Sequence, residues 1–297
     1  MAAMEPEMAF TDEAGNLRLN EAGRDAIARE LAYVAIAAGK LIRDITARGV
    51  VASEKPDGSA CTDADVAAER LIVAELARRF PGVAVVGEET ASAASGPLPA
   101  LFFLVDPIDG TSEFVAGGDG YTVNIALIHD GAPIAGVILA PAQARAWTGG
   151  ATAHAADAVL STPAGALAWR PLHTRPTPED GLVALASARH GDAATEAWLA
   201  RMPVSARRNA SSSLKFCVIA AGEADVYPRF GRTMEWDTAA GQAVLTAAGG
   251  VVTEPDGRMF RYGDWRGGFA NGPFIAWGDP LAALTHAGPK AGPGREA

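Results

Sequence analysis

The sequence predicts an α/β protein in which helices and buried strands alternate along both halves of the chain. Long segments with apolar residues at helical spacing are separated by short apolar runs that Gly, Pro and Asp residues bound. With 297 residues, the chain can form one large domain or two modest ones with a sizeable core. Hydrophobic residues make up 49% and charged residues 20% of the sequence, which is typical of a globular protein and not of a disordered one.

Two helices are predicted in the first quarter of the chain. Asn20 is a suitable N-cap for a helix over 21–47, where Leu, Val, Ala and Ile residues keep a helical spacing. A polar loop is expected over 53–59. A second helix is then predicted over 62–80, because Thr62 can cap it and a Pro-Gly pair follows its last residue.

Four strands are predicted next. Apolar runs at 83–86 and 101–105 are short enough for strands, and the second lacks any polar residue, so we expect it to be buried on both faces. The segments 121–129 and 132–140 are joined by Asp130-Gly131, a dipeptide typical of hairpin turns. We therefore predict that these two strands are paired.

Pro and Gly residues cluster at 170–181, which favours a subdomain boundary there. The segments expected beyond it are strands at 182–186 and 250–253 and helices at 193–200, 213–221 and 235–248. The whole chain is then divided into a loosely ordered extension (1–20), an N-terminal α+β subdomain (21–175), a C-terminal α/β subdomain (176–286) and a flexible tail (287–297).

Charge and cysteine content exclude several classes of protein. The formal net charge of −10 argues against general nucleic-acid binding, because a phosphate backbone would be repelled. If the substrate is anionic, bound cations must reverse the field in the site. Two cysteines, Cys61 and Cys217, exclude a disulfide framework and a Cys-rich zinc site, which fits a reducing cytoplasm.

Membrane and export signals are not evident in the sequence. No segment approaches the ~20 consecutive apolar residues that cross a bilayer, and residues 1–16 lack the basic-then-apolar pattern of an export signal. We expect a cytoplasmic protein, and a peripheral association with the inner membrane face stays open. The chain is expected to be a monomer or a homodimer.

The most informative stretch is 101–114. Its strand delivers Asp106 and Asp109 into a tight turn, in which Pro107 biases Asp106 towards an extended conformation. Gly110 permits an unusual backbone angle or a close approach to a bound group. Two carboxylates at the end of a buried strand suit hard cations and phosphate oxygens. The alternative is that Asp-Gly is simply a common turn dipeptide.

Other segments supply acids in similar positions. Glu88 and Glu89 follow the strand at 83–86, Asp237 lies in the first turn of a predicted helix, and Asp65 lies near the start of another. Carboxylates and a carbonyl form a plausible magnesium site, since Mg²⁺ takes near-octahedral oxygen coordination. The five histidines are scattered without the spacing of metal ligands, which excludes a zinc enzyme and a Ser-His-Asp hydrolase.

Together these segments resemble the inositol monophosphatase superfamily of magnesium-dependent, lithium-sensitive phosphatases. The signature of that family (Asp-Pro, a residue such as Ile, then Asp-Gly and Ser or Thr) matches residues 106–111, and its C-terminal counterpart matches 236–241. The resemblance covers about 28–277. It implies the layered αβαβα sugar-phosphatase fold, with the site between the two subdomains.

Within the superfamily, further segments resemble bacterial CysQ-type 3'(2'),5'-bisphosphate nucleotidases. These segments are 55–59, 113–114, 121–124, 211–217 and 227–231. The resemblance implies hydrolysis of the 3'-phosphate of adenosine 3',5'-bisphosphate to AMP and phosphate, with 3'-phosphoadenylyl sulfate as a further substrate. Two alternatives stay open: an inositol, histidinol or sugar monophosphate phosphatase of the same superfamily, and a non-catalytic relative that binds a phosphorylated ligand.

Roles for single residues follow from the same resemblance. Two or three Mg²⁺ ions are expected on the carboxylates and one carbonyl of Glu88, Asp106, Ile108, Asp109 and Asp237. Water activation is expected from Glu88 and from Thr111 hydrogen-bonded to Asp65. The substrate is expected to meet Glu88, Ile108, Asp109, Gly110, Thr111 and Asp237, with backbone donors of Gly110 and Thr111 on the phosphate.

Structural roles compete with some of these assignments. Thr62 and Asp65 also form a helix-capping pattern, and Asp237 could merely complement the positive end of its helix. Glu88 and Glu89 could be solvated loop acids.

Several charged or polar residues have no assigned role. Lys215, Arg229 and Arg232 either bind a second phosphate or the adenine side of the substrate, or are surface charges. Glu235 would disfavour a doubly phosphorylated ligand if it faced the site. Cys61 is expected to be a small buried packing residue.

Overall fold

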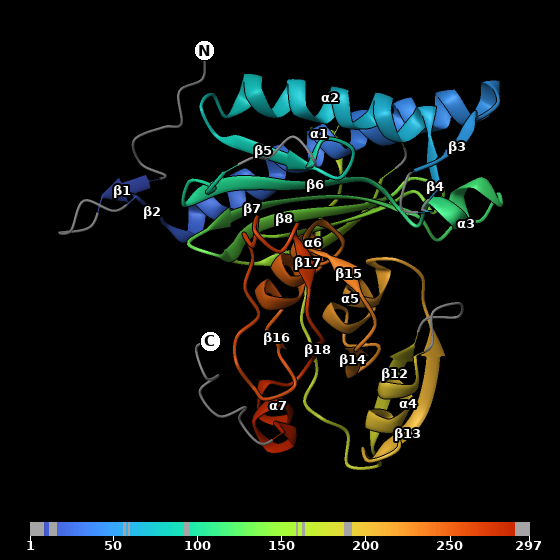
Figure 1. Ribbon diagram of the computed structural model, residues 1–297. Coiled ribbons are helices and arrows are strands. Elements are labelled where there is room, and N and C mark those ends of the chain that lie inside the picture. Colours follow the sequence, from blue (N-terminus) through green and yellow to red (C-terminus); the bar gives the residue numbers. More distant parts are fainter. Residues whose placement is uncertain are drawn as a thin grey trace.

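The computed structural model describes residues 9–11, 17–55, 58, 60–91, 96–158, 160–161, 164–186 and 192–288. Its elements form five layers, in the order helices, sheet, helices, sheet, helices (Figure 1). Helices α1 and α2 cover one face of a seven-stranded sheet, and α5 and α6 lie between this sheet and a five-stranded one. The expected αβαβα arrangement is confirmed.

Both N-terminal helices form where the sequence predicted them. Helix α1 (Glu21–Arg48) is capped by Asn20, whose Oδ1 accepts a hydrogen bond from Gly23 N at 2.7 Å. Helix α2 (Asp63–Arg79) is capped by Thr62. The two helices contact each other, and α1 also packs on β8 through a face rich in buried alanines.

The seven-stranded sheet places the central acidic segment between two partner strands. In spatial order its strands are β11 (Arg170–Leu172), β10 (Ala153–Asp157), β9 (Arg145–Gly149), β8 (Ala132–Ala140), β7 (Thr122–His129), β6 (Leu101–Asp109) and β5 (Ala84–Gly87). Only β5 and β6 are parallel; the other neighbouring pairs are antiparallel. Residues 102–108 of β6 are buried, so the predicted burial on both faces is confirmed.

The predicted hairpin is also confirmed. Strands β7 and β8 pair antiparallel, and Asp130 and Gly131 at the turn have φ angles of 50° and 73°. These two left-handed conformations are the ones that a tight hairpin turn requires. Strands β9 to β11 were not predicted, because they are only three to five residues long and their Ala, Gly, Asp and Pro residues are depleted in strands.

The five-stranded sheet forms the second half of the fold. Its strands are β13 (Val204–Asn209), β12 (Leu182–Ala186), β14 (Val226–Arg229), β18 (Phe274–Trp277) and β16 (Val251–Thr253) in spatial order. Its helices are α4 (Ala193–Leu199), α5 (Leu214–Ala220), α6 (Glu235–Ala247) and α7 (Pro280–His286). The predicted elements at 182–186, 193–200, 213–221, 235–248 and 250–253 are confirmed with small shifts at their ends, whereas β13, β14, β18 and α7 were not predicted.

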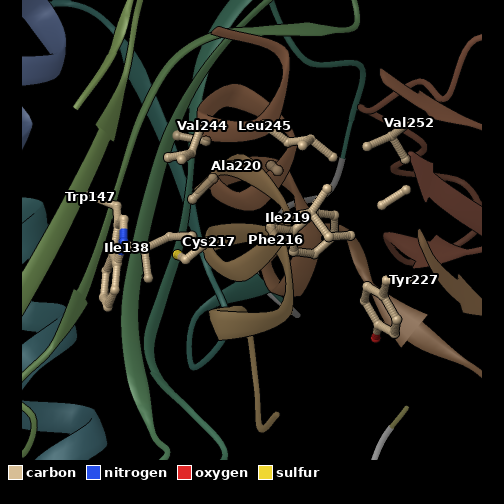
Figure 2. Close-up of a cluster of buried hydrophobic side chains, with 14 of the residues drawn as sticks. Ile138, Trp147, Phe216, Cys217, Ile219, Ala220, Tyr227, Val244, Leu245 and Val252 are labelled. Carbon is tan, nitrogen blue, oxygen red and sulfur yellow. The ribbon is translucent and has the colours of Figure 1, made fainter. Parts of the chain in front are cut away.

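Helices α5 and α6 are buried on both sides. Figure 2 shows Cys217 of α5 directed towards Ile138 and Trp147 of the seven-stranded sheet, and Phe216 directed away from them, on the side of Tyr227. Because a Cβ at Gly241 of α6 would collide with the Phe216 ring, the two helices pack at a distance that only glycine permits there. Glycine at position 241 is therefore required by the packing of α6 against α5.

Four small elements complete the fold. Strand β15 (Thr233–Met234) pairs with β17 (Ala270–Asn271), η2 (Ala164–Ala166) is a 3-10 turn, and α3 (Thr111–Val115) follows β6.

Two expectations need correction. Strands β3 (Ala52–Glu54) and β4 (Ala60–Thr62) form a hairpin where a polar loop was expected. In the N-terminal extension, β1 (Ala9–Thr11) pairs with β2 (Leu17–Leu19), although no regular structure was expected there.

Other expectations fall outside the described residues: those for Pro56, Asp57, Ser59 and the tail beyond residue 288. The two large sheets draw their strands from residues 84–172 and 182–277, and on this ground we keep the division near residue 175 as a proposal. None of the helices in the described part of the chain has the length and hydropathy needed to cross a membrane.

Candidate active site

Strand β6 carries the central carboxylates of the site. It continues to Asp109, beyond the predicted end at Val105, and its register with β7 shifts between Asp106 and Asp109. Asp106 is 1% exposed, and its Oδ1 accepts a hydrogen bond from Ile108 N at 3.0 Å. Gly110 has a φ of 93°, a conformation that favours glycine, and α3 begins directly after it. The Asp-Gly pair is thus a turn that also delivers acids to a cavity.

Asp65 combines the two roles that the sequence left open. Its Oδ2 accepts from Thr62 N at 2.8 Å and from Thr62 Oγ1, which completes a capping box at the start of α2. Its other oxygen, Oδ1, accepts from Thr111 Oγ1 at 3.3 Å. The Thr111 hydroxyl also lies 3.0 Å from Ile108 O, so it can donate to either oxygen. The structure therefore brings Asp65 and Thr111 together without loss of the cap.

Glu88 and Glu89 follow β5 at the edge of the site. Lys55 Nζ lies 2.7 Å from both Glu88 Oε1 and Glu89 Oε1. Burial lowers the pKa of Lys55, but its hydrogen bonds to the two carboxylates outweigh this effect and raise it, so Lys55 is cationic at neutral pH. On the inner side, the buried Glu69 carboxylate accepts from Glu89 N at 2.8 Å. Neither Glu88 nor Glu89 is a solvated loop acid.

Asp109 is held by groups from two distant parts of the chain. Its Oδ2 lies 2.7 Å from Ser213 N and 3.0 Å from Ser213 Oγ, which precede α5. Asn124 Nδ2 and Thr122 Oγ1 of β7 lie 3.4 and 3.5 Å from the same oxygen. The orientation of this carboxylate is therefore fixed from both sides of the site.

Asp237 lies in the first turn of α6, as predicted. Its Oδ2 accepts from Met234 N at 2.8 Å, so the expected interaction with the positive end of the helix is present. Asp237 also lines the cavity described below. The helix-capping role and a place in the cavity wall therefore coexist at Asp237.

Charge repulsion makes the acidic set suitable for a cation. Burial raises the pKa of Asp106 well above its ordinary value, and the charges of Glu88 and Asp109 raise it further. Burial followed by the charge of Asp109 has the same effect on the pKa of Asp237. Oxygen ligands of one sign, close enough to repel each other, match the preference of a hard divalent cation. The donor set therefore fits Mg²⁺.

The carboxylates do not form a finished coordination shell. Within the described residues, no three Asp, Glu, His or Cys side chains converge closely enough to hold a metal ion as they stand. Glu88 is engaged by Lys55, Asp109 by Ser213 and Asp237 by Met234 N. Each of these contacts engages one carboxylate oxygen and leaves the other oxygen of the same side chain for a further partner.

A cavity of about 480 Å³ joins these acids to a basic wall. Glu88, Asp109, Gly110, Thr111 and Asp237 line one part of it. The remaining lining residues are Gly58, Ala60, Ser112, Glu113, Ser211, Ser212, Lys215, Phe216, Tyr227, Arg229, Arg232, Thr233 and Thr238. The cavity thus presents carboxylates and cations to the same space.

Lys215, Arg229 and Arg232 all line this cavity, but they differ in burial: Lys215 is buried, Arg229 is half-buried and Arg232 is exposed. Lys215 is 4% exposed; its Nζ donates to Ser212 O at 3.0 Å and lies 5.0 Å from the centre of the Tyr227 ring. Burial lowers the pKa of Lys215 to about 8, against the opposing effect of Asp109. A buried cation of this kind is well suited to an anionic ligand.

Glu235 does not disturb this arrangement. Its carboxylate accepts hydrogen bonds from Gly263 N at 2.7 Å and Asp264 N at 2.8 Å, and it is absent from the cavity lining.

Cys61 is buried, as expected, and its Sγ lies 3.4 Å from Glu89 Oε2. Burial raises the pKa of the Cys61 thiol to about 12, so it is protonated at neutral pH.

The sequence did not reveal four residues that orient the acids: Lys55, Glu69, Asn124 and Ser213. Three of them lie in segments that resemble the nucleotidases, but a local pattern does not show which carboxylate each one contacts. Glu69 carried a weaker signal, because it lies one helical turn after Asp65 and therefore on the same face of α2.

Comparison with known proteins identifies the class to which this fold and site belong. The model of the "Inositol monophosphatase family" matches residues 24–286, so the chain belongs to that family. It is accordingly a phosphatase of this superfamily, and the resemblance seen in the sequence is confirmed.

Particular relatives narrow this class. The chain is 36% identical over 217 residues to "3'(2'),5'-bisphosphate nucleotidase CysQ" of Escherichia coli (strain K12), which covers 70% of this chain and 81% of that protein. The crystal structure of CysQ from Bacteroides thetaiotaomicron has a TM-score of 0.69 and 30% identity, over 85% of this chain and 97% of that one. An inositol monophosphatase from Anabaena has a TM-score of 0.65 at 22% identity, over 90% and 98% of the two chains, and shows the fold alone.

Proposed function

We propose that the protein is a magnesium-dependent 3'(2'),5'-bisphosphate nucleotidase. It hydrolyses the 3'-phosphate of adenosine 3',5'-bisphosphate to give AMP and inorganic phosphate, and it accepts 3'-phosphoadenylyl sulfate by the same route. The relatives named CysQ support the substrate class.

One observation carries this proposal: the cavity has an acidic part and a basic part. Glu88, Asp109 and Asp237 lie where cations would receive the phosphate that is removed. Lys215, Arg229 and Arg232 line the same cavity and provide a place for a second phosphate that is kept. A monophosphate ester would bring no second phosphate to these basic residues, whereas a bisphosphate uses both parts of the cavity.

The residues proposed to hold the cations are Glu88, Asp106, Asp109 and Asp237, with the Ile108 carbonyl. Two or three Mg²⁺ ions bound there would supply Lewis-acid stabilisation of charge on the phosphoryl oxygens and a lowered pKa of coordinated water. Because the pKa values of these carboxylates are raised by burial and mutual repulsion, cation binding would also return them to the charged form.

Asp65 and Thr111 are proposed to orient the attacking water. When Asp65 Oδ1 accepts the hydroxyl hydrogen of Thr111, a lone pair of Thr111 Oγ1 becomes available to accept a hydrogen from water. Glu88 lines the same cavity as Thr111 and is proposed to share this role. The backbone N–H groups of Gly110 and Thr111 are proposed to hold the phosphate as α3 begins.

A substrate panel tests this proposal. Phosphate release from adenosine 3',5'-bisphosphate, 3'-AMP and inositol 1-phosphate is measured with the purified protein in Mg²⁺ and again after addition of EDTA. We expect the bisphosphate to have the highest kcat/KM and EDTA to abolish turnover. A preference for inositol 1-phosphate would instead favour the inositol, histidinol or sugar monophosphate phosphatase. Binding of the bisphosphate without turnover would favour the non-catalytic relative.

Inhibition by lithium provides a separate check. Li⁺ is expected to inhibit turnover at millimolar or lower concentration if the site has the cation chemistry that the family resemblance implies. The inhibition is measured against equal concentrations of Na⁺, which control for ionic strength. Complete insensitivity to Li⁺ would indicate a different cation geometry.

A further inference from the structure

Three consecutive serines contact the loop that carries Asp109. Ser211 Oγ donates to Glu113 Oε2 at 2.9 Å, and Ser212 Oγ donates to Asp109 O at 3.0 Å. Ser213 N donates to Asp109 Oδ2 at 2.7 Å. We call Ser211–Ser213 the serine clamp. Every one of its members therefore makes a hydrogen bond to residues 109–113, about 100 positions earlier in the chain.

The backbone of the clamp is strained in the middle. Ser212 has a φ of 48°, a conformation that residues with a side chain rarely adopt. Such strain persists only where the surrounding structure over-determines it, and it is concentrated at functional sites. The strain here turns Ser212 Oγ onto the Asp109–Gly110 turn so closely that a Cβ at Gly110 would collide with it.

Ser213 also connects the clamp to the second half of the fold. Its Oγ lies 2.8 Å from the Asp237 carbonyl oxygen and accepts a hydrogen bond from Asn124 Nδ2 at 2.8 Å. The side chain is 1% exposed, so water does not compete for these bonds. One serine thus joins β7 and the Asp109 carboxylate of the seven-stranded sheet to the first turn of α6.

We propose that the serine clamp is a positioning device that sets the separation of Asp109 and Asp237, and thereby the affinity of the site for Mg²⁺. This inference rests on the proposed function, which assigns those two acids to the cation. The clamp keeps the two acids in one geometry although they belong to different subdomains. Ser213 is the most important residue of the clamp, because it contacts the carboxylate of Asp109 and the carbonyl oxygen of Asp237.

The test compares matched serine variants by calorimetric titration with Mg²⁺. Ser213→Ala removes the hydroxyl, keeps the backbone donor, and is expected to weaken Mg²⁺ binding about 10–100-fold, the usual effect of losing an outer-sphere partner of a metal ligand. Ser213→Thr keeps the hydroxyl and is expected to restore most of the affinity. Ser205→Ala is the control: this exposed serine donates to Gly181 O far from the acids, and no change is expected.

A second variant changes Ser212, which is only half-buried, so its effect does not depend on repacking of a buried position. Ser212→Gly removes the hydroxyl bond to Asp109 O and relieves the positive φ, so it is expected to fold at least as well as the wild type while binding Mg²⁺ more weakly. Thermal unfolding in EDTA checks folding of each variant, and titrations are made at a temperature where all are folded. A purely structural clamp would lower the unfolding temperature and leave the Mg²⁺ dissociation constant unchanged.

The outcomes separate this inference from the proposed function. If the wild type binds Mg²⁺ and turns over the bisphosphate, but Ser213→Ala and Ser212→Gly bind Mg²⁺ like the wild type, the clamp is overturned and the proposed function stands. If the wild type does not bind Mg²⁺, the proposed function fails and the clamp fails with it. Weakened binding in both variants with an unchanged control supports the clamp.

Discussion

Asp109 is half-buried among hydrogen-bond donors and lines the cavity. Burial raises the pKa of this carboxyl, while Lys215 and Ser213 oppose the rise. Hydrogen bonds and the Lys215 charge therefore offset part of the free-energy cost of desolvating this carboxylate, and the proposed Mg²⁺ would offset more of it.

Asp109→Asn keeps an acceptor for Ser213 N and removes the charge. We expect kcat to fall by at least ~10²-fold, because a lost direct ligand should cost more than the outer-sphere partners of metal sites do. The unfolding temperature in EDTA should be unchanged or higher, since an unfavourable buried charge is gone. Phosphate release and circular dichroism melting measure both quantities; near-normal turnover would contradict the assignment of Asp109 as a ligand.

The lowered pKa of Lys215 predicts that substrate binding depends on pH. Because burial lowers its pKa to about 8, this side chain is cationic below pH 8 and neutral above it in the free protein. KM for adenosine 3',5'-bisphosphate should therefore rise as pH increases past about 8, whereas KM for 3'-AMP, which lacks the second phosphate, should change less. Initial rates from pH 6.5 to 9.5 with both substrates provide the measurement.

Lys215→Met supplies the control for that profile. It removes the titrating group and retains an apolar chain of similar length against Tyr227. The rise in KM above pH 8 should disappear, and KM for the bisphosphate should be high at every pH. An unchanged profile in the variant would assign the titration to another group.

Two glycines in turns between elements, Gly110 and Gly82, share a left-handed backbone but differ in their surroundings. Gly110 ends β6 with a φ of 93° and begins α3, and Ser212 Oγ occupies the space that a side chain would need. Gly82 lies in the turn between α2 and β5 and has a similar φ of 87°, but no atom lies within 4 Å of a Cβ built there. The two glycines therefore share the backbone requirement and differ in the packing requirement.

Comparison of Gly110→Ala with Gly82→Ala separates these two effects. Both should lose about 1–2 kcal/mol of unfolding free energy from the left-handed backbone, and Gly110→Ala should lose more because Ser212 must move. Only Gly110→Ala should reduce turnover. Urea unfolding and phosphate release test this; equal losses of stability with unchanged turnover would show that the Gly110–Ser212 contact has no role in the site.

Cation binding should stabilise the molecule as a whole, since the acids come from both halves of the fold. Carboxyls whose pKa is raised in the folded state, such as Asp106 and Asp237, favour folding at pH values below their ordinary pKa, and this contribution is lost as pH rises. A bound divalent cation offsets that loss, because it binds the folded state in preference to the unfolded one.

The rise in unfolding temperature on addition of Mg²⁺ should therefore be larger at pH 8 than at pH 5.5, where protons compete for the same carboxylates. Differential scanning calorimetry with Mg²⁺, with Ca²⁺ and with EDTA at both pH values gives the comparison. An equal increment at the two pH values would indicate that Mg²⁺ binds elsewhere on the molecule.

Local patterns were sufficient for features that depend on neighbouring residues in the chain. The hairpin at Asp130-Gly131 follows from two residues that tolerate a positive φ, and the caps at Asn20 and Thr62 follow from side chains that reach a helix start. Strands β9 to β11 were missed because they are short and contain Ala, Gly, Asp and Pro residues, which are depleted in strands. The hairpin β3–β4 was missed because its strands are short and largely polar.

The sequence by itself determined the family and the order of the main helices and strands, and it supplied the acids that we propose for the site, because each is encoded in contiguous residues. Only the tertiary structure decided which groups hold those acids: Lys55 on Glu88, and Ser213 on Asp109 from 104 positions away. The physical reason is that a hydrogen bond between distant segments depends on how two sheets and their helices pack, and no local propensity specifies that packing.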